Sequence, residues 1–307
     1  MKIVFMGTPQ FAVPTLDTLI NNGHEISAVV TVPDKPKGRG QKLGISDVKE
    51  YALSKNLKVL QPVKLKDENF LNELRALEPD LIIIVAFRVL PTVIFDIPKH
   101  GIFNLHGSLL PKYRGAAPIN WAIINGDKET GVTTFFLQEK VDTGNIILQE
   151  SIPIGENDNM GVIYNKLSEI GAELVLKTVL EIESNNVILQ EQNHELASPA
   201  PKIFKEDCRI DWSKSSEQIH NLVRGLSPYP GAFSTLDEKV FKIYSTLKTD
   251  LTSESQAGVL IKDGKKLFVN TNDNLLEILE LQLEGKKRIH AIDFLNGVSF
   301  EKELRLV

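Results

Sequence analysis

The 307-residue sequence predicts an α/β protein in which a parallel sheet with crossover helices comes first and a small β-barrel follows. In the first half, short apolar runs alternate with helical patterns, which is typical of strand–helix–strand units. In the last third, five short strand-like runs follow one another, with turn residues between several of them, which favours a barrel. We therefore expect an α/β domain over residues 1–189, a polar, proline-containing linker over 190–206 and a barrel over 207–307, for which the oligonucleotide-binding (OB) type is one candidate.

The composition is that of an ordinary globular protein, with 42% hydrophobic and 24% charged residues. A formal net charge of −5 argues against nucleic-acid binding driven by overall charge, so any RNA contact must use a local patch. The first apolar run, Ile3–Met6, is too short for a signal peptide or a membrane span, and a single cysteine, Cys208, fits a reducing cytosol. We expect a cytoplasmic monomer that uses no metal.

The elements of the first domain can be assigned from their apolar patterns. Lys2–Gly7 is almost continuously apolar, as expected of a strand buried on both faces. Thr8 and Pro9 then have the residue types of an N-cap and a first helical position. Further strands are expected at Glu25–Val32, Leu81–Val85, Gly101–Leu105 and Gly131–Leu137, and a long helix at about 159–183.

The second domain is expected to begin with a helix over Ser215–Gly225. Turn residues such as Asp263-Gly264 separate the runs that follow. These runs predict strands at Gly231–Leu236, Lys239–Leu247, Gly258–Ile261, Leu267–Val269 and Leu275–Leu283.

Three polar residues are candidates for a reaction centre. Asn104 and His106 lie at the end of a buried strand, where ligands bind in open parallel sheets, and residues two apart on an extended chain share a face. Asp142, in an Asp-Thr-Gly turn, follows the next strand and reaches the same edge if that strand is parallel. Taken singly, each is more often an ordinary loop residue. Together, an amide, an imidazole and a carboxylate can stabilise an oxyanion and move a proton, as acyl-type transfer requires.

These motifs resemble the methionyl-tRNA formyltransferase family. The likeness rests on the run from Asn104 to Pro118, on Asp142-Thr143-Gly144 and on the opening Gly7-Thr8-Pro9. It extends over most of the chain, including Asp34–Gly40 and Arg209-Ile210-Asp211-Trp212.

The resemblance implies a Rossmann-like formyltransferase domain and a C-terminal, tRNA-binding barrel. It implies 10-formyltetrahydrofolate as donor and the α-amino group of methionine on initiator tRNA as acceptor, for translation initiation. Asn104, His106 and Asp142 match the family's catalytic residues. Its folate-contacting motif falls on Ser108, Leu109, Leu110 and Pro111, where the Ser108 hydroxyl is expected to bond the ligand and the leucines to form an apolar wall; the alternative is an ordinary buried turn.

A basic segment bears on the acceptor. It contains Lys35, Lys37, Arg39 and Lys42, interrupted by proline and glycine, and its cations can meet phosphates. Without the resemblance, a solvated loop is the better interpretation. In the family, an insertion here reads the acceptor end of the tRNA, with an arginine that matches Arg39.

Two other functions remain open on the sequence alone. One is a formyltransferase acting on a small-molecule amine such as a nucleotide sugar, or a formyltetrahydrofolate hydrolase; the basic segment argues against both. The other is a tRNA-binding protein without catalysis, which the three polar residues argue against. The chain also departs from the family at Phe87-Arg88, near the expected pterin pocket, where it is one residue shorter than the usual pattern. A G-x-G-x-x-G fingerprint is absent, so a nicotinamide cofactor is not expected.

Overall fold

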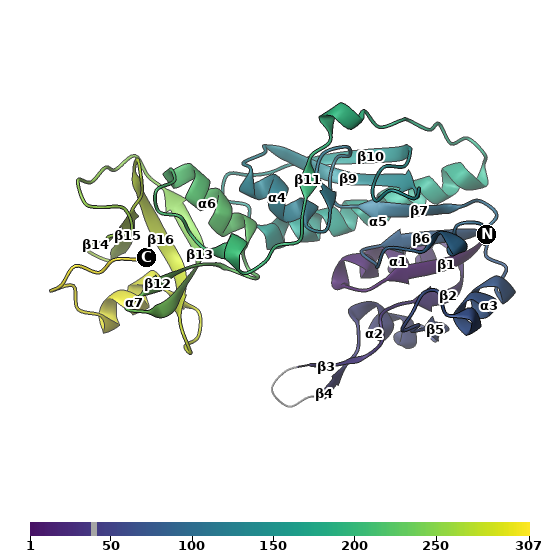
Figure 1. Cartoon of the computed structure of the whole chain (residues 1–307), viewed down its shortest axis with the longest axis horizontal. Helices are drawn as coiled ribbons and strands as arrows, with labels where there is room; N and C mark the ends of the chain where they lie inside the picture. Colours follow the sequence, from purple (N-terminus) through teal and green to yellow (C-terminus); the bar gives the residue numbers. More distant parts are fainter. Residues whose placement is uncertain (38–41) are drawn as a thin grey trace. The chain divides into compact units, whose positions relative to one another are not determined.

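The structure, a computed structural model, describes residues 1–37 and 42–307 (Figure 1). It has two compact units: residues 1–115, 131–152 and 164–200 form the first, and residues 116–130, 153–163 and 201–307 form the second. Residues 116–130 and 153–163, which the sequence places in the first domain, thus belong to the second unit. Helix packing accounts for one of them, because the Asn120 amide on α4 (Pro118–Ile124) donates a 2.8 Å hydrogen bond to the carbonyl of Gly225, at the end of α6 (Ser216–Gly225).

The first unit is built on a sheet whose strand order is β10-β9-β7-β6-β1-β2-β5. Strands β5, β2, β1, β6 and β7 are parallel neighbours, whereas β9 pairs antiparallel with β7. The bounds are β1 Lys2–Gly7, β2 Glu25–Val30, β5 Val59–Leu60, β6 Leu81–Val85, β7 Ile102–His106, β9 Glu129–Phe136 and β10 Ile146–Pro153. The expected parallel sheet is therefore present, with an antiparallel addition at one edge.

The helices α1 (Val13–Asn21), α2 (Asp47–Ser54) and α3 (Glu68–Ala76) lie between strands of this sheet in the chain. The long α5 (Met160–Glu183) follows its last strand, β10. The prediction that Thr8 and Pro9 start the first helix is wrong, because a short 3-10 turn, η1 (Gln10–Ala12), precedes α1 and has Pro9 as its N-cap. The Phe11 amide in this turn donates to the Tyr164 hydroxyl at 2.7 Å, a contact 153 residues away in sequence that no local pattern reveals.

The chain order creates a switch point between β1 and β6. From β1 the chain moves outward to β2 and β5, then returns to β6 on the other side of β1. Ligands bind at such points, outside the carboxyl ends of the strands. Phe87-Arg88, where the chain departs from the family pattern, lies in the loop that follows β6 at this switch point. The Arg88 guanidinium donates to the carbonyls of Pro62 and Val63 at 2.9 and 3.1 Å, and so ties the loop after β6 to the loop after β5.

The second unit contains a six-stranded antiparallel sheet around its own apolar core. Its strands are β12 (Ala232–Leu236), β13 (Lys239–Lys248), β14 (Leu260–Asp263), β15 (Lys266–Asn270), β16 (Leu275–Leu283) and β17 (Ile289–His290), with α7 (Ala291–Gly297) after them. The C-terminal segment reaches both edge strands. The Leu260 amide on β14 donates to the Leu304 carbonyl, and Thr235 on β12 exchanges two backbone hydrogen bonds with Val307. These bonds close the sheet into the predicted small barrel.

Short pairs complete the structure: β3 (Lys35–Lys37) with β4 (Lys42–Gly44), and β8 (Arg114–Gly115) with β11 (Pro199–Ala200). Single 3-10 turns lie at η2 (Thr92–Ile94), η3 (His194–Leu196) and η4 (Glu206–Cys208). Within the described ranges, a helix with the length and apolarity needed to cross a membrane is not found.

Candidate active site

Asn104 and His106 are held on a strand that has partners on both sides. Asn104 lies opposite Ile84 of β6 and Phe135 of β9, and His106 lies opposite Thr133. The alternation of β7 places both side chains on one face, as the sequence predicts. His106 is buried, while Asn104 is partly exposed, and among the residues the structure describes its amide has no hydrogen-bond partner. That amide is available to a ligand.

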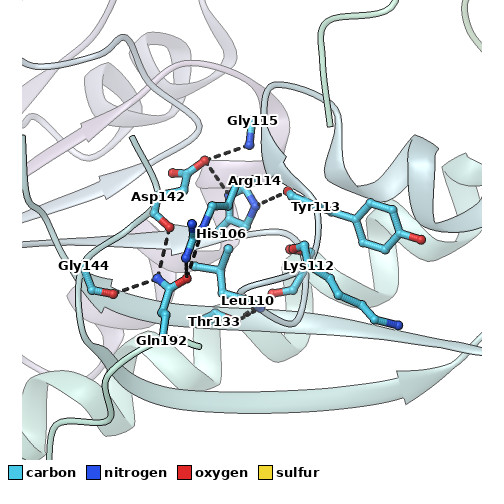
Figure 2. A network of polar contacts seen from close by, with 11 residues as sticks. His106, Leu110, Lys112, Tyr113, Arg114, Gly115, Thr133, Asp142, Gly144 and Gln192 are labelled. Atoms are coloured by element: carbon cyan, nitrogen blue, oxygen red, sulfur yellow. Dashed lines mark hydrogen bonds and ion pairs between the residues drawn. The ribbon is translucent and has the colours of Figure 1, made fainter. Parts of the chain in front are cut away.

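The His106 ring has a fixed orientation (Figure 2). Its Nε2 lies 2.8 Å from the carbonyl oxygen of Tyr113, and because a carbonyl can only accept, Nε2 carries the proton. The ring also packs edge-to-face on Phe135, with centroids 6.5 Å apart. Nδ1 therefore points the other way, toward Oδ2 of Asp142 at 3.8 Å. This distance is longer than a hydrogen bond, and because both atoms are acceptors while Nε2 holds the ring proton, a bond forms between them only when Nδ1 gains a proton.

Asp142 reaches this edge by a route that differs from the predicted one. Because β9 is antiparallel, it ends at Phe136, beside Phe103 near the start of β7, and not beside His106. The loop 137–145 between β9 and β10 then folds back and brings Asp142 to His106. There the Gly115 amide donates to Oδ2 of Asp142 at 2.9 Å. His106 and Asp142 thus lie close together as predicted, although the condition given for it, a parallel strand, is not met.

The turn after β7 is fastened to β9 and β10 by side chains. The Thr133 hydroxyl donates to the Ser108 carbonyl at 2.7 Å and accepts from the Leu110 amide at 3.1 Å. The Gln149 amide donates to both the Thr133 hydroxyl and the Leu110 carbonyl, each at 2.9 Å. These bonds make the turn a rigid wall of the site, and none of them could be foreseen from sequence spacing.

The same turn corrects one expectation about folate contacts. Ser108 is fully buried and its hydroxyl donates to the Lys112 carbonyl at 2.7 Å, so it does not fit the direct ligand bond expected of it. Leu110 packs inward against Phe135, away from solvent. Leu109 and Pro111 stay partly exposed and are the members of the motif that can still face a ligand.

A cleft of about 870 Å³ lies in the first unit, and Arg114 and Thr143, sequence neighbours of Gly115 and Asp142, are part of its lining. Asn104, His106 and Asp142 themselves are not among the residues that line it. Its lining is Phe95, Arg114, Leu137, Gln138, Glu139, Lys140, Thr143 and His194.

Lys35 and Lys37 of the basic segment lie on β3 and Lys42 lies on β4, and these two strands pair antiparallel. The Lys35 side chain is exposed. Arg39 lies outside the described residues.

Comparison with known proteins assigns the chain to a family. The formyl transferase pattern matches residues 1–179, and the C-terminal domain pattern of formyl transferases matches residues 202–299. The methionyl-tRNA formyltransferase of Flavobacterium johnsoniae is 49% identical, over 100% of this chain and 99% of its own length. That of Clostridioides difficile is 48% identical over the full length of both. The chain belongs to the methionyl-tRNA formyltransferase family. The resemblance expected from the sequence motifs is thereby confirmed.

Solved structures of other formyltransferases share the fold. One is an N-formyltransferase from Helicobacter canadensis, described in complex with folinic acid and dTDP-3-aminofucose. It is 23% identical with a TM-score of 0.71, over 94% of this chain and 100% of that chain. At this identity the likeness supports the architecture of a methionyl-tRNA formyltransferase family member, and the acceptor must be argued separately.

Proposed function

We propose that this chain transfers the formyl group of 10-formyltetrahydrofolate to the α-amino group of methionine on initiator methionyl-tRNA, for translation initiation. The observation that carries the proposal is the full-length identity of 49% and 48% with methionyl-tRNA formyltransferases. The folinic acid named for the Helicobacter canadensis structure supports a folate as donor on this fold.

The proposed reaction forms one C–N bond and breaks another. The neutral amine attacks the formyl carbon, and the carbonyl oxygen becomes an oxyanion that the Asn104 amide stabilises, together with the His106 ring once Nδ1 has gained a proton. Asp142 takes the proton that the amine loses, directly or through His106. The bond from the carbon to N10 of the folate then breaks, and N10 receives a proton, so the net change is a formyl group exchanged for a proton. An α-amine titrates near neutral pH, so positioning matters more than a strong base.

The same proposal places the protein in the cytoplasm, because translation initiates there. We also propose a monomer, in which His106 and Asp142 lie 3.8 Å apart within one chain. Of the predicted folate motif, Leu109 and Pro111 are proposed to contact the donor, and Ser108 and Leu110 to shape the turn.

A direct assay distinguishes this function from transfer to a small-molecule amine. The protein is incubated with 10-formyltetrahydrofolate and with either methionyl-tRNA or a dTDP-linked amino sugar, and the formylated product is quantified. We expect formylmethionyl-tRNA and no formylated sugar. Formylation of the sugar without formylation of the tRNA contradicts the proposal, and release of formate without any acceptor indicates a hydrolase.

The basic segment is proposed to contact the acceptor end of the tRNA through Lys35, Lys37, Arg39 and Lys42. Arg39→Ala should raise KM for methionyl-tRNA by roughly tenfold, the order of one charge-assisted phosphate contact, and leave the affinity for 5-formyltetrahydrofolate unchanged. Steady-state kinetics with tRNA and calorimetric titration with the folate measure the two effects. Unaltered kinetics with tRNA would remove this role.

A further inference from the structure

Gln192 is buried and links two segments of the candidate site (Figure 2). Its amide nitrogen donates to the carbonyls of Asp142 and Gly144 at 3.0 and 2.7 Å. Its amide oxygen accepts from Nε and Nη2 of Arg114 at 3.1 and 2.5 Å. A glutamine amide has two N–H donors and an oxygen with two lone pairs, so every hydrogen-bonding position of this side chain is occupied.

The turn that Gln192 holds has an uncommon backbone. Asp142 has a φ of 55°, in the left-handed region that L-residues other than glycine, asparagine and aspartate seldom adopt. At Gly144 the chain runs so close to the Phe136 carbonyl that a Cβ atom would overlap it. The two carbonyls bonded by Gln192 lie within this tight turn, one on Asp142 itself. The amide of Gln192 therefore fixes the peptide groups that set the direction of the Asp142 side chain.

Gln192 also steadies the donor to the carboxylate. The Gly115 amide bonds Oδ2 of Asp142, and the residue before it, Arg114, is held by the oxygen of Gln192. Arg114–Gly115 also pairs with Pro199–Ala200, and this second strand belongs to the same segment, residues 190–206, as Gln192. Part of the predicted linker 190–206 is thus built into the catalytic unit, where it contacts both the backbone of Asp142 and the segment that bonds its carboxylate.

We propose that Gln192 is a positioning residue for formyl transfer, which keeps the Asp142 carboxylate directed at Nδ1 of His106. The inference rests on the proposed function, because it concerns the rate of that reaction. The 3.8 Å between Nδ1 and Oδ2 must shorten for a proton to pass. A displacement of about 1 Å between two groups that exchange a proton can lower the rate by up to about 10²-fold. A turn released from Gln192 loses this alignment while the folate and tRNA surfaces stay intact.

A purely structural role makes a different prediction. If Gln192 only satisfied buried carbonyls, its replacement would lower the melting temperature and weaken ligand binding together with turnover. A positioning role lowers kcat selectively. The two roles are therefore distinguished by measuring whether kcat falls while KM and the affinity for folate stay unchanged.

Two substitutions and a matched control test the proposal. Gln192→Glu keeps the side-chain length and an acceptor for Arg114 but removes the amide donors, and Gln192→Met removes all polar contacts at similar size. Gln190→Glu makes the same chemical change on an exposed side chain two residues earlier. Both Gln192 variants should lower kcat by about tenfold or more, with KM for methionyl-tRNA and Kd for 5-formyltetrahydrofolate within about threefold of wild type. Gln190→Glu should match the wild type throughout.

Two results would overturn the proposal. One is a kcat within about twofold of wild type in both Gln192 variants. The other is a parallel loss of kcat, folate affinity and melting temperature in both variants, which assigns Gln192 to folding alone. Failure of the proposed function is seen separately, because the wild-type protein would then not formylate methionyl-tRNA at all.

Discussion

Asp142→Asn is expected to lower kcat for the formylation of methionyl-tRNA by roughly 10²-fold or more, the scale of acid–base assistance. The substitution keeps the size of the side chain, and asparagine tolerates the left-handed backbone as aspartate does. Its amide oxygen can still accept from Gly115. What disappears is the negative charge that faces Nδ1 of His106 and the group that takes the amine's proton. Single-turnover formylation at saturating donor and acceptor measures this loss.

The control for this variant is Asp96→Asn, which removes a carboxylate from an exposed position of the same unit. It should have wild-type turnover. The affinity of Asp142→Asn for 5-formyltetrahydrofolate and its melting temperature should stay close to those of the wild type. A turnover within about fivefold of wild type would exclude Asp142 from proton transfer.

His106→Ala is expected to lower kcat by a similar factor, roughly 10²-fold or more. The ring is anchored by the Tyr113 carbonyl and by Phe135, so its Nδ1 is presented to Asp142 in one orientation. Removing the ring leaves the carboxylate in place but takes away both the proton carrier and one stabiliser of the oxyanion. Turnover is measured as for Asp142→Asn.

Added imidazole provides the control for the His106 variant. Because the missing ring leaves a space of its own size, free imidazole should restore part of the turnover of His106→Ala and have no effect on the wild type. Near-normal turnover without imidazole would show that the ring takes no part in the chemistry.

Much of the fold could be predicted from the sequence because its elements have strong apolar patterns. Lys2–Gly7, Leu81–Val85 and Leu275–Leu283 have the predicted bounds in the structure. The start of the first helix could not be predicted, because the turn before it is bonded through the Phe11 amide to Tyr164, a partner 153 residues away. Closure of the barrel depends on backbone bonds made by residues 304–307, which carry no strand pattern of their own.

The candidate site was predictable to different degrees. Asn104 and His106 share a face by alternation along one strand, which sequence spacing is sufficient to show. Asp142 required the family resemblance, because an apolar run looks the same whether its strand is parallel or antiparallel. Gln192 gave no signal, since a single glutamine in a polar stretch is ordinary until its partners, 48 and 50 residues earlier, are brought beside it.

The most direct test of the account is the double variant His106→Ala/Asp142→Asn, compared with both single variants in single-turnover formylation of methionyl-tRNA. Residues that act on one proton as a unit have strongly non-additive effects. We predict that the double variant is about as slow as the slower single variant. A loss equal to the product of the two single losses, on the order of 10⁴-fold, would contradict the account, because it would mean that His106 and Asp142 act independently.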